Sequence, residues 1–508
     1  IFSLVVLVIA VIVSGTYALY KAQLSKNIGV NTTTHGLAYY INYVKGTDIT
    51  AATLNPSTSY EGGASSDIEF WKKDDSYDIY GKIELTVNTI GTNLSNSPAL
   101  KYAVVNNGNV LKEGSLKGTT SGSKVTILKN LYLEQTKQIY TVYVWLDNSE
   151  ELGNISNESL SISVDCTASL QKEPAADTII SLYTSAAKVT ATNNSITYNT
   201  APSVSLMNDR LGGTTTSLDG GNIRYYGASP NNYIYFNCSD YSNQTSSTCE
   251  TWRIIGVFDG KLKLIRGSQI GKYSWDNKNI STGAEDDRGK NDWTTARLMK
   301  LLNPDDYYIN DNNDKDSEGN YLGYSLYYNS ASGMCFTDEG VNYSACDFTS
   351  TGIKNDETRN MIAETTYNLG GWNDTGVYPN EIYEYERGTT VYTGRPTTWT
   401  GKIALAYPSD YGYAADLNQC KQTLANYDNS TCTSNNWMKA IITDNGSNHG
   451  WLLTPDSSYS FGAWYSHGNV GEYFTGAARG AVPVLSLSSK LGIESGDGSS
   501  SNPYKLSA

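Results

Sequence analysis

The sequence has little of what most enzymes and nucleic-acid-binding proteins need. Positive charge is scarce, with 37 Lys and Arg against 51 Asp and Glu, which gives a formal net charge of −14. Such a chain is repelled by phosphate, so we expect neither nucleic acid nor anionic lipid as a partner. Histidine is limited to His35, His449 and His467, and the motifs G-x-S-x-G, H-E-x-x-H and G-x-x-x-x-G-K-[ST] are absent. We therefore expect no enzyme. A metal pair at His449 and His467 lacks a clear third ligand, which favours surface polar residues there.

The closely spaced C-x-x-C pairs that bind metals are also missing. Of the seven cysteines, six lie in pairs that bracket polar loops: Cys238 with Cys249, Cys335 with Cys346, and Cys420 with Cys432. This spacing predicts three local disulfides and an oxidising compartment. Cys166 is left over, either buried or available for an intermolecular bridge. We expect a secreted protein that is extracellular or associated with the cell surface.

One long apolar run is present, from Ile1 to Val13, and Thr16-Tyr17-Ala18 follows it. The run suits the apolar core of a secretion signal and is short for a membrane span of about 20 residues. We expect residues 1–18 to be a cleaved signal peptide. An uncleaved anchor, which would be the only membrane contact, and a pilin-like stalk remain as alternatives. The polar stretch at residues 27–34 breaks the helical pattern that a stalk would continue.

Residues 19–168 predict an all-β domain. Apolar residues alternate in KIELTV and in IYTVYVWLD, and an Asn-Gly pair at residues 107–108 predicts a tight turn between two strands. Several short strands separated by turns indicate a β-sandwich or jelly roll. Tyr outnumbers Phe by 40 to 8. This bias favours either strands or a surface that meets sugars and proteins.

About 150 residues of the N-terminal region also resemble a known family. The stretch SGTYALYKAQLSKNIGVNTTTHGLAYYINY is similar to the start of TasA/camelysin-like proteins, and LSISVDCTAS is similar to their closing strand. The resemblance implies a jelly roll, a signal cut by a SipW-type peptidase and a mature chain that starts near Leu19. It also implies assembly into filaments, in which the N-terminal strand, here Leu19–Val30, is donated to the next subunit.

Residues 169–222 are expected to be a connector, and residues 223–508 an α+β domain. In the latter, NNYIYFNC and ETWRIIGVFDGKLKLIRG predict strands. DWTTARLMKLLN predicts a helix with Asp292 as its N-cap, and NDETRNMIAETTYNLGG predicts a helix that ends at Gly370. WTGKIALAYPSDYGYA and AVPVLSLSS predict core strands.

This second region resembles an uncharacterised module of Firmicutes surface proteins. The matching stretches include TWRIIGVFDGKLKLIRG, HGWLLTP and GAVPVLSLSSKLGIESGDGSSSNPYKL. The resemblance implies a fold like that of C-type lectins and formylglycine-generating enzymes. Relatives tend to have Val-Arg-Pro where this chain has Ala481-Val482-Pro483, so their Arg is absent here or replaced by Arg479.

An acidic stretch at residues 303–323 suggests calcium as a cofactor. Asp314, Asp316 and Glu318 alternate before Gly319, which resembles a calcium loop, and Asp311 lies nearby. Ser325 stands where an EF-hand has its bidentate Glu. The alternative is a solvated surface loop without a metal ion.

The segment SSYSFGAWYSHGNVGEYFTGAARG is expected to be a loop and is the best candidate for a ligand site. Its aromatic rings could stack on sugars, and its polar groups could fix hydroxyls. The residues expected to bind ligand are Trp464, Tyr465, Asn469, Glu472 and Tyr473. The alternative is that the aromatic side chains complete the core of the domain.

Taken together, the sequence predicts a multidomain protein with an all-β sandwich followed by an α+β, lectin-like domain. The expected function is that of an adhesin that binds a host or microbial glycan or protein. The alternative is a subunit of an extracellular matrix or filament that binds copies of itself. No LPxTG-like sorting signal or C-terminal apolar tail occurs. We therefore expect neither a bond to the cell wall nor a C-terminal anchor.

Overall fold

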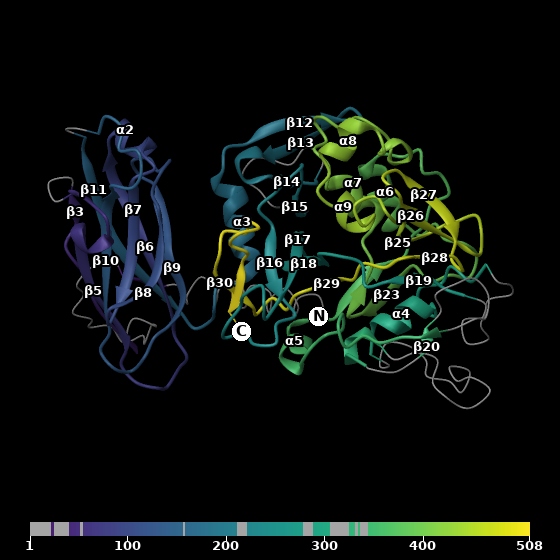
Figure 1. The fold of residues 1–508 in the computed structure, drawn as a ribbon, viewed down its shortest axis with the longest axis horizontal. Coiled ribbons are helices and arrows are strands. Elements are labelled where there is room, and N and C mark those ends of the chain that lie inside the picture. The colour runs from purple at the N-terminus through teal and green to yellow at the C-terminus, as the bar shows by residue number, and fades with distance from the viewer. Residues whose placement is uncertain are drawn as a thin grey trace, which may run out of the picture. The chain divides into compact units, whose positions relative to one another are not determined.

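The computed structural model shows two compact units, residues 1–173 and 174–508 (Figure 1). The residues whose structure it describes are 22–24, 40–50, 54–155, 158–210, 221–277, 288–304, 325–330, 334–335 and 344–507. The signal peptide expected at residues 1–18 therefore lies outside the described residues. Within the described part of the chain, no helix is long and apolar enough to cross a membrane.

The first unit consists of two β-sheets around one core, as a β-sandwich requires (Figure 1). One sheet has the order β1 (Ala22–Leu24), β11 (Leu160–Ser169), β6 (Tyr80–Ile90) and β9 (Lys124–Tyr132), with β3 (Ile49–Thr50) also paired to β11. The other has the order β2 (Ile41–Val44), β5 (Ala64–Lys72), β10 (Ile139–Asp147), β7 (Leu100–Asn106) and β8 (Asn109–Ser115), with β4 (Pro56–Ser57) parallel to β10.

The alternation seen in the sequence explains this sandwich. Ile83, Leu85 and Val87 of β6 all point into the core and are fully buried, because successive side chains of a strand face opposite sides. The predicted Asn-Gly turn joins β7 to β8, and Asn107 and Gly108 have φ angles of 50° and 78°. Two residues with positive φ fit the twist of a hairpin, so this prediction is confirmed.

The prediction of a connector over residues 169–222 is wrong for much of this range, because most of these residues fold as part of the second unit. Residues 175–208 form α3 (Ala175–Ser185), β12 (Val189–Asn193), β13 (Ile196–Ala201) and β14 (Leu206–Asn208). Ile179 and Tyr183, one helical turn apart, are fully buried in the core of this unit. Such a pair on one helix face is typical of a packed helix rather than of a linker.

Two large sheets organise the second unit. The nine-stranded sheet continues from β14 to β15 (Ile223–Tyr225), β17 (Glu250–Phe258), β18 (Lys261–Arg266), β29 (Val484–Ser486) and β24 (Ile403–Ala404), and β16 (Tyr233–Phe236) pairs with β17. The five-stranded sheet has the order β19 (Lys272–Ser274), β28 (Ala478–Gly480), β25 (Gly450–Pro455), β26 (Gly462–Ser466) and β27 (Val470–Phe474). The strands predicted in NNYIYFNC and ETWRIIGVFDGKLKLIRG are confirmed as β16, β17 and β18.

Among the described residues, short helices and three two-stranded sheets complete this unit. The small sheets pair β20 (Met334–Cys335) with β21 (Ser344–Ala345), β22 (Thr365–Asn368) with β23 (Thr398–Gly401), and β30 (Gly492–Ser495) with β31 (Lys505–Ser507). Figure 1 shows α6 to α9 gathered beside β25 and β26. The helices are α4 (Arg297–Leu302), α5 (Asp356–Met361), α6 (Pro379–Glu386), α7 (Pro408–Tyr413), α8 (Ser430–Ser434) and α9 (Lys439–Ile442).

Both predicted helices are shorter than the sequence pattern indicated. α4 begins only at Arg297, and the Asp292 side chain accepts a hydrogen bond from Thr294 N in the preceding turn. Asp292 is thus not the N-cap. The second helix ends at Met361. The β-branched Thr365 and Thr366 then enter a strand, which suits them better, so Gly370 is not a helix C-cap.

Two of the three predicted disulfides are confirmed, Cys238–Cys249 and Cys420–Cys432. Cys346 is also disulfide-bonded, and the side chain of Cys335 lies outside the described residues. Cys166 is a free thiol buried on β11, and burial raises its pKa. A buried thiol is not accessible to a second chain, so in the folded unit Cys166 is not available for an intermolecular bridge.

Charged side chains are buried in the core of the second unit. The Arg224 Nε lies 2.5 Å from an oxygen of Asp209, and its Nη1 lies 2.8 Å from an oxygen of Asp410. Lys263 pairs with the other oxygen of Asp410. We call these four residues the buried ion network. Burial alone would raise the pKa of Asp410, but the charges of Lys263 and Arg224 outweigh it and lower the pKa to about 2.

Candidate functional site

The segment that the sequence predicted to be an aromatic loop is a β-hairpin, which is a correction. β26 and β27 pair antiparallel, so Trp464 lies opposite Glu472, and Tyr465 lies opposite Gly471. Directly opposed residues of an antiparallel pair share one face. Trp464 and Glu472 therefore lie on one face of the hairpin. Tyr465 and Tyr473 lie on the other, which we call the aromatic face.

Trp464 belongs to the core and not to a ligand site, which corrects its expected role. Its side chain is fully buried in a cluster with residues of α7 and α9. Its indole nitrogen donates a hydrogen bond of 3.1 Å to the Trp372 carbonyl oxygen. The ring is therefore satisfied both by packing and by hydrogen bonding. For Trp464, the alternative interpretation, that the aromatic side chain completes the core of the domain, is the correct one.

Glu472 shares the face of Trp464, where it meets a second carboxyl group. Burial, followed by a hydrogen bond to Asp456 and the charges of Asp456 and Asp374, raises the pKa of Glu472 to about 8. Asp456 is fully buried, and one of its oxygens accepts hydrogen bonds from the amides of Ser458 and Tyr459. Two carboxyl groups this close disfavour each other's ionisation, which raises the pKa of one of them. Glu472 thus contributes to a local acid pair, away from the aromatic face.

The aromatic face is built around Arg479 of β28. Its guanidinium carbon lies 4.0 Å from the ring centre of Tyr465 and 4.4 Å from that of Tyr473. A guanidinium over a tyrosine ring is attracted by the ring electrons. The side chain of Tyr473 is 40% exposed, whereas Tyr465 is half-buried. The result is a fixed arrangement of two phenol rings and one positive charge at the surface.

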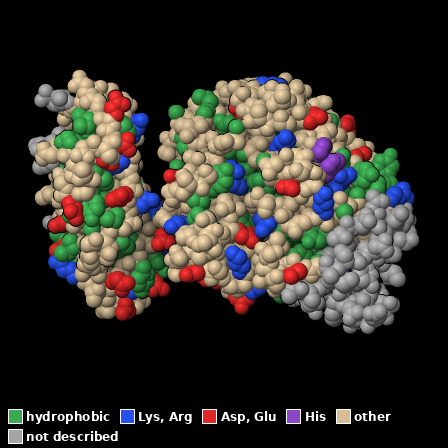
Figure 2. All heavy atoms as spheres, in the orientation of Figure 1, with side chains coloured by type: hydrophobic (Ala, Val, Ile, Leu, Met, Phe, Trp, Pro, Cys, Tyr) green, Lys and Arg blue, Asp and Glu red, His purple; other side chains and the backbone are tan. Residues whose placement is uncertain are grey.

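Two histidines extend the aromatic face. The His449 ring stacks on Tyr465, with ring centres 5.1 Å apart, and lies 4.1 Å from the ring of His467. Arg479 Nη1 lies 2.5 Å from His449 Nδ1. Burial, followed by the charges of Arg479, His467 and Lys272, lowers the pKa of His449 to about 4. Figure 2 shows the histidine side chains at the surface of the second unit, next to Lys and Arg side chains.

Asn469 shapes the hairpin turn. The His467 amide donates to the Asn469 carbonyl oxygen at 2.9 Å, and Gly468 between them has a φ of 105°, which only glycine adopts freely. Of the five predicted ligand residues, the structure brings Tyr465 and Tyr473 together on one face. Trp464 and Glu472 lie on the opposite face, and the backbone of Asn469 closes the turn between the two strands.

Sequence reasoning missed Arg479 and His449 as site residues. His449 precedes β25 and Arg479 lies in β28, and the two strands meet where Gly450 pairs with Gly480. The two residues are 30 positions apart in the chain. Only the order of strands in the sheet brings them together. The nearest signal in the sequence was the presence of two histidines near these tyrosines, His449 before the aromatic segment and His467 within it.

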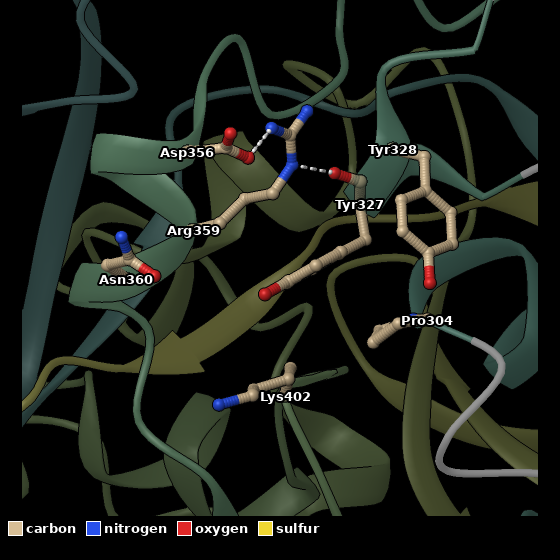
Figure 3. A pocket seen from close by; sticks show the side chains of 7 residues that line it. All are labelled: Pro304, Tyr327, Tyr328, Asp356, Arg359, Asn360 and Lys402. Atoms are coloured by element: carbon tan, nitrogen blue, oxygen red, sulfur yellow. Dashed lines mark hydrogen bonds and ion pairs between the residues drawn. The ribbon is translucent and has the colours of Figure 1, made fainter.

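A hollow of about 430 Å³ lies elsewhere in the second unit (Figure 3). Figure 3 shows the Tyr327 side chain extending between Arg359 and Lys402. Arg359 donates to Asp356 at 2.6 Å and to the Tyr327 carbonyl oxygen at 2.8 Å. Lys402 donates to the Ile362 carbonyl oxygen at 3.2 Å. Because both cations already bind partners in the protein, this hollow is a weaker candidate for a ligand site than the aromatic face.

The calcium site expected at Asp311, Asp314, Asp316 and Glu318 lies outside the described residues. In the part of the chain that the structure does describe, no group of three or more His, Cys, Asp or Glu is arranged to hold a metal ion.

Comparisons with known proteins do not identify this chain. No family model and no curated protein matches it. Two solved crystal structures, both titled as mutants of HCR/D, are 12% identical to it and cover 53% of this chain and 76% and 77% of their own. Their TM-scores are 0.16 and 0.15. Scores this low carry no argument about fold or function.

Proposed function

We propose that this is an extracellular, non-enzymatic recognition protein whose second unit binds a glycan through the aromatic face. The observation that carries the proposal is the exposed ring of Tyr473, held beside Tyr465 by the Arg479 guanidinium. Rigid aromatic rings with polar groups at their edges suit the apolar and hydroxyl faces of a sugar. The two disulfides fit an oxidising, extracellular compartment.

A glycan array with the full chain tests this proposal. The parent protein is expected to bind a specific glycan, and Tyr473→Ala is expected to lose that binding. Since Tyr473 is partly exposed, the variant should keep its fold, which circular dichroism can check. Tyr77→Ala is the matched control, because Tyr77 in the first unit is 45% exposed. If Tyr473→Ala binds as well as the parent, the aromatic face is not the site.

A second function, as a subunit of a filament, is favoured by one observation in the first unit. β1 pairs antiparallel with β11, so that Leu24 lies opposite Cys166 and Ala22 lies opposite Ala168. A strand that completes a sheet from near the N-terminus is also suited to complete the sheet of a neighbouring copy. Under this proposal, the TasA/camelysin-like resemblance describes assembly, and the second unit decorates the filament.

Electron microscopy and light scattering separate the two functions. The protein that starts at Leu19 should form ordered filaments as its concentration rises, and deletion of residues 19–30 should leave soluble monomers. The deletion must keep a β-rich circular dichroism spectrum, so that loss of assembly does not reflect unfolding. Parent protein that stays monomeric at high concentration contradicts the filament function and leaves glycan recognition untouched.

A further inference from the structure

The polar groups on the aromatic face are mostly hydrogen-bond donors. On this face Arg479 comes from β28, and His449 and His467 flank β25 and β26; Lys272 of β19 lies opposite Gly480, on the other face of the sheet. Lys272 and His467 are exposed, and Lys272 lies close enough to His449 to lower its pKa. Arg and Lys side chains can donate but cannot accept. This local concentration of positive charge stands out in a chain whose net charge is −14.

The contact with Arg479 also fixes the proton on His449. Because guanidinium can only donate, the Nδ1 atom of His449, 2.5 Å from Arg479 Nη1, must act as the acceptor. The neutral imidazole then carries its proton on Nε2. His449 therefore offers a second donor from a ring that already stacks on Tyr465.

Carboxylates near this face are few among the described residues. Glu472, the carboxyl group of the hairpin, lies on the opposite face with Trp464. Asp428 lies beside Gly468, but Lys439 lies there as well and balances its charge. Neutral sugars donate as many hydrogen bonds as they accept, so a site for them needs acceptors. A site with an excess of donors instead favours a ligand rich in acceptors.

We propose that the aromatic face binds a saccharide that carries a carboxylate, as in the uronic-acid units of an acidic glycan. Arg479 and the Nε2–H of His449 bind the carboxylate oxygens, Lys272 adds positive charge nearby, and the exposed ring of Tyr473 packs against the sugar. This inference rests on the proposed glycan-binding function and names its ligand class. The charge of the whole chain repels long polyanions, so the ligand is a short acidic saccharide or an exposed acidic unit.

Calorimetry with the full chain tests the charge requirement. The probes are a glucuronate-containing trisaccharide and its neutral glucose counterpart. The acidic probe should bind, and the neutral one should bind at least about tenfold more weakly, since a charge-assisted hydrogen bond to a carboxylate is lost. Raising the salt concentration should lower the affinity for the acidic probe and leave the affinity for the neutral probe unchanged, because salt screens attraction between exposed charges.

Three variants locate the effect. Arg479→Gln should lower the affinity for the acidic probe about tenfold or more, and Arg479→Lys should restore part of it, because Lys keeps the charge but not the fork geometry. Lys490→Gln is the charge-matched control. Lys490 is exposed between β29 and β30, and Figure 1 shows β30 and β27 on opposite sides of the second unit.

The outcomes separate this inference from the function on which it rests. If both probes bind equally well and Tyr473→Ala binds neither, the carboxylate requirement is overturned, but the proposed glycan recognition is supported. Arg479→Gln that folds like the parent and binds the acidic probe equally well also overturns the inference. Binding of neither probe, nor of any other glycan on the array, overturns both proposals.

Discussion

The two units hold their cores together in different ways. In the first unit, the buried side of a long strand such as β6 is apolar, with Ile83, Leu85 and Val87 at alternate positions. In the second unit, the buried ion network lies within the core, and the side chains of Arg224 and Asp410 are each only 1% exposed. An apolar core tolerates side chains that fit each other only approximately in shape. A buried charge, in contrast, strongly destabilises the fold when its partner is removed. The second unit should therefore be more sensitive to single polar substitutions.

The largest expected effect is the loss of a buried charge. Asp410→Asn leaves Arg224 and Lys263 without their shared carboxylate and should lower the free energy of unfolding by about 3–5 kcal/mol. The control is Asp147→Asn in the first unit, since Asp147 pairs with Lys101 at the surface, where ion pairs contribute little. Chemical denaturation followed by tryptophan fluorescence measures both. Equal effects of the two substitutions would contradict the difference drawn between the units.

Substitutions on the two faces of the β26–β27 hairpin should also differ in their effect on stability, almost as strongly as the two aspartate substitutions. Trp464→Ala removes a fully buried ring and should destabilise the second unit by about 3–5 kcal/mol. Tyr473→Ala removes a partly exposed ring and should cost far less stability while abolishing glycan binding. Thermal denaturation and binding assays on the same samples check this pair. A stable Trp464→Ala variant that loses binding would reverse the assignment of the two faces.

Each of the two disulfides should contribute a similar amount to the free energy of unfolding, somewhat less than the buried groups above. Replacing Cys420 and Cys432 by Ser opens one short loop and should cost about 3 kcal/mol in the chain-entropy model. Cys166→Ser, which removes a thiol without a disulfide, serves as the comparison. Peptide mapping under non-reducing conditions should recover the 238–249 and 420–432 cross-links. Free thiols at these positions in protein expressed with residues 1–18 would contradict the proposed extracellular location.

The most gradual predicted effect is a pH dependence of the stability of the second unit. Burial, opposed by Arg387 and by hydrogen bonds from Ser409, raises the pKa of Glu386 from 4.5 to about 7. The folded unit thus holds a proton that the unfolded chain releases between these values. Glu386 contributes stability that is fully present below pH 4.5 and is lost as pH rises to about 7, by at most about 1.4 kcal/mol per pH unit.

Glu386→Gln removes this titration, so the stability of the variant should change less between pH 4.5 and 7. Asp276 has its pKa raised to about 7 by burial and leaves a residual slope of the same sign. His449 acts in the opposite direction: its pKa is lowered to about 4, so stability falls as pH drops from 6.5 towards 4. Urea denaturation at several pH values measures the slopes. An unchanged slope in Glu386→Gln would show that Glu386 is ionised in the folded unit.

The sequence predicted the first unit better than the second, for physical reasons. Alternation in β6 and the Asn-Gly turn at residues 107–108 are local features, so the sandwich follows from them. In the second unit, the start of α4 depends on a hydrogen bond from Arg297 N to Asp276, 21 residues away. No local pattern at Asp292 could reveal that bond.

The candidate site follows the same rule. The sequence predicts Tyr465 and Tyr473 as site residues because aromatic residues among glycines and polar residues are a local signal. Trp464 looked the same in the sequence, and only the pairing of β26 with β27 shows that it faces the core. Arg479 and His449 meet through the parallel pairing of β28 with β25, which short-range patterns do not encode.

The central claim is that ligand binds on the aromatic face, and the scarcity of histidine allows a direct test. The chain has three histidines, so imidazole nitrogen resonances in a ¹⁵N-histidine-labelled sample are few and can be assigned with His449→Gln and His467→Gln. Titration with the glucuronate-containing trisaccharide should shift the resonances of His449 and His467 and leave that of His35 unchanged. Binding detected by calorimetry without any shift at His449 or His467 would contradict the account.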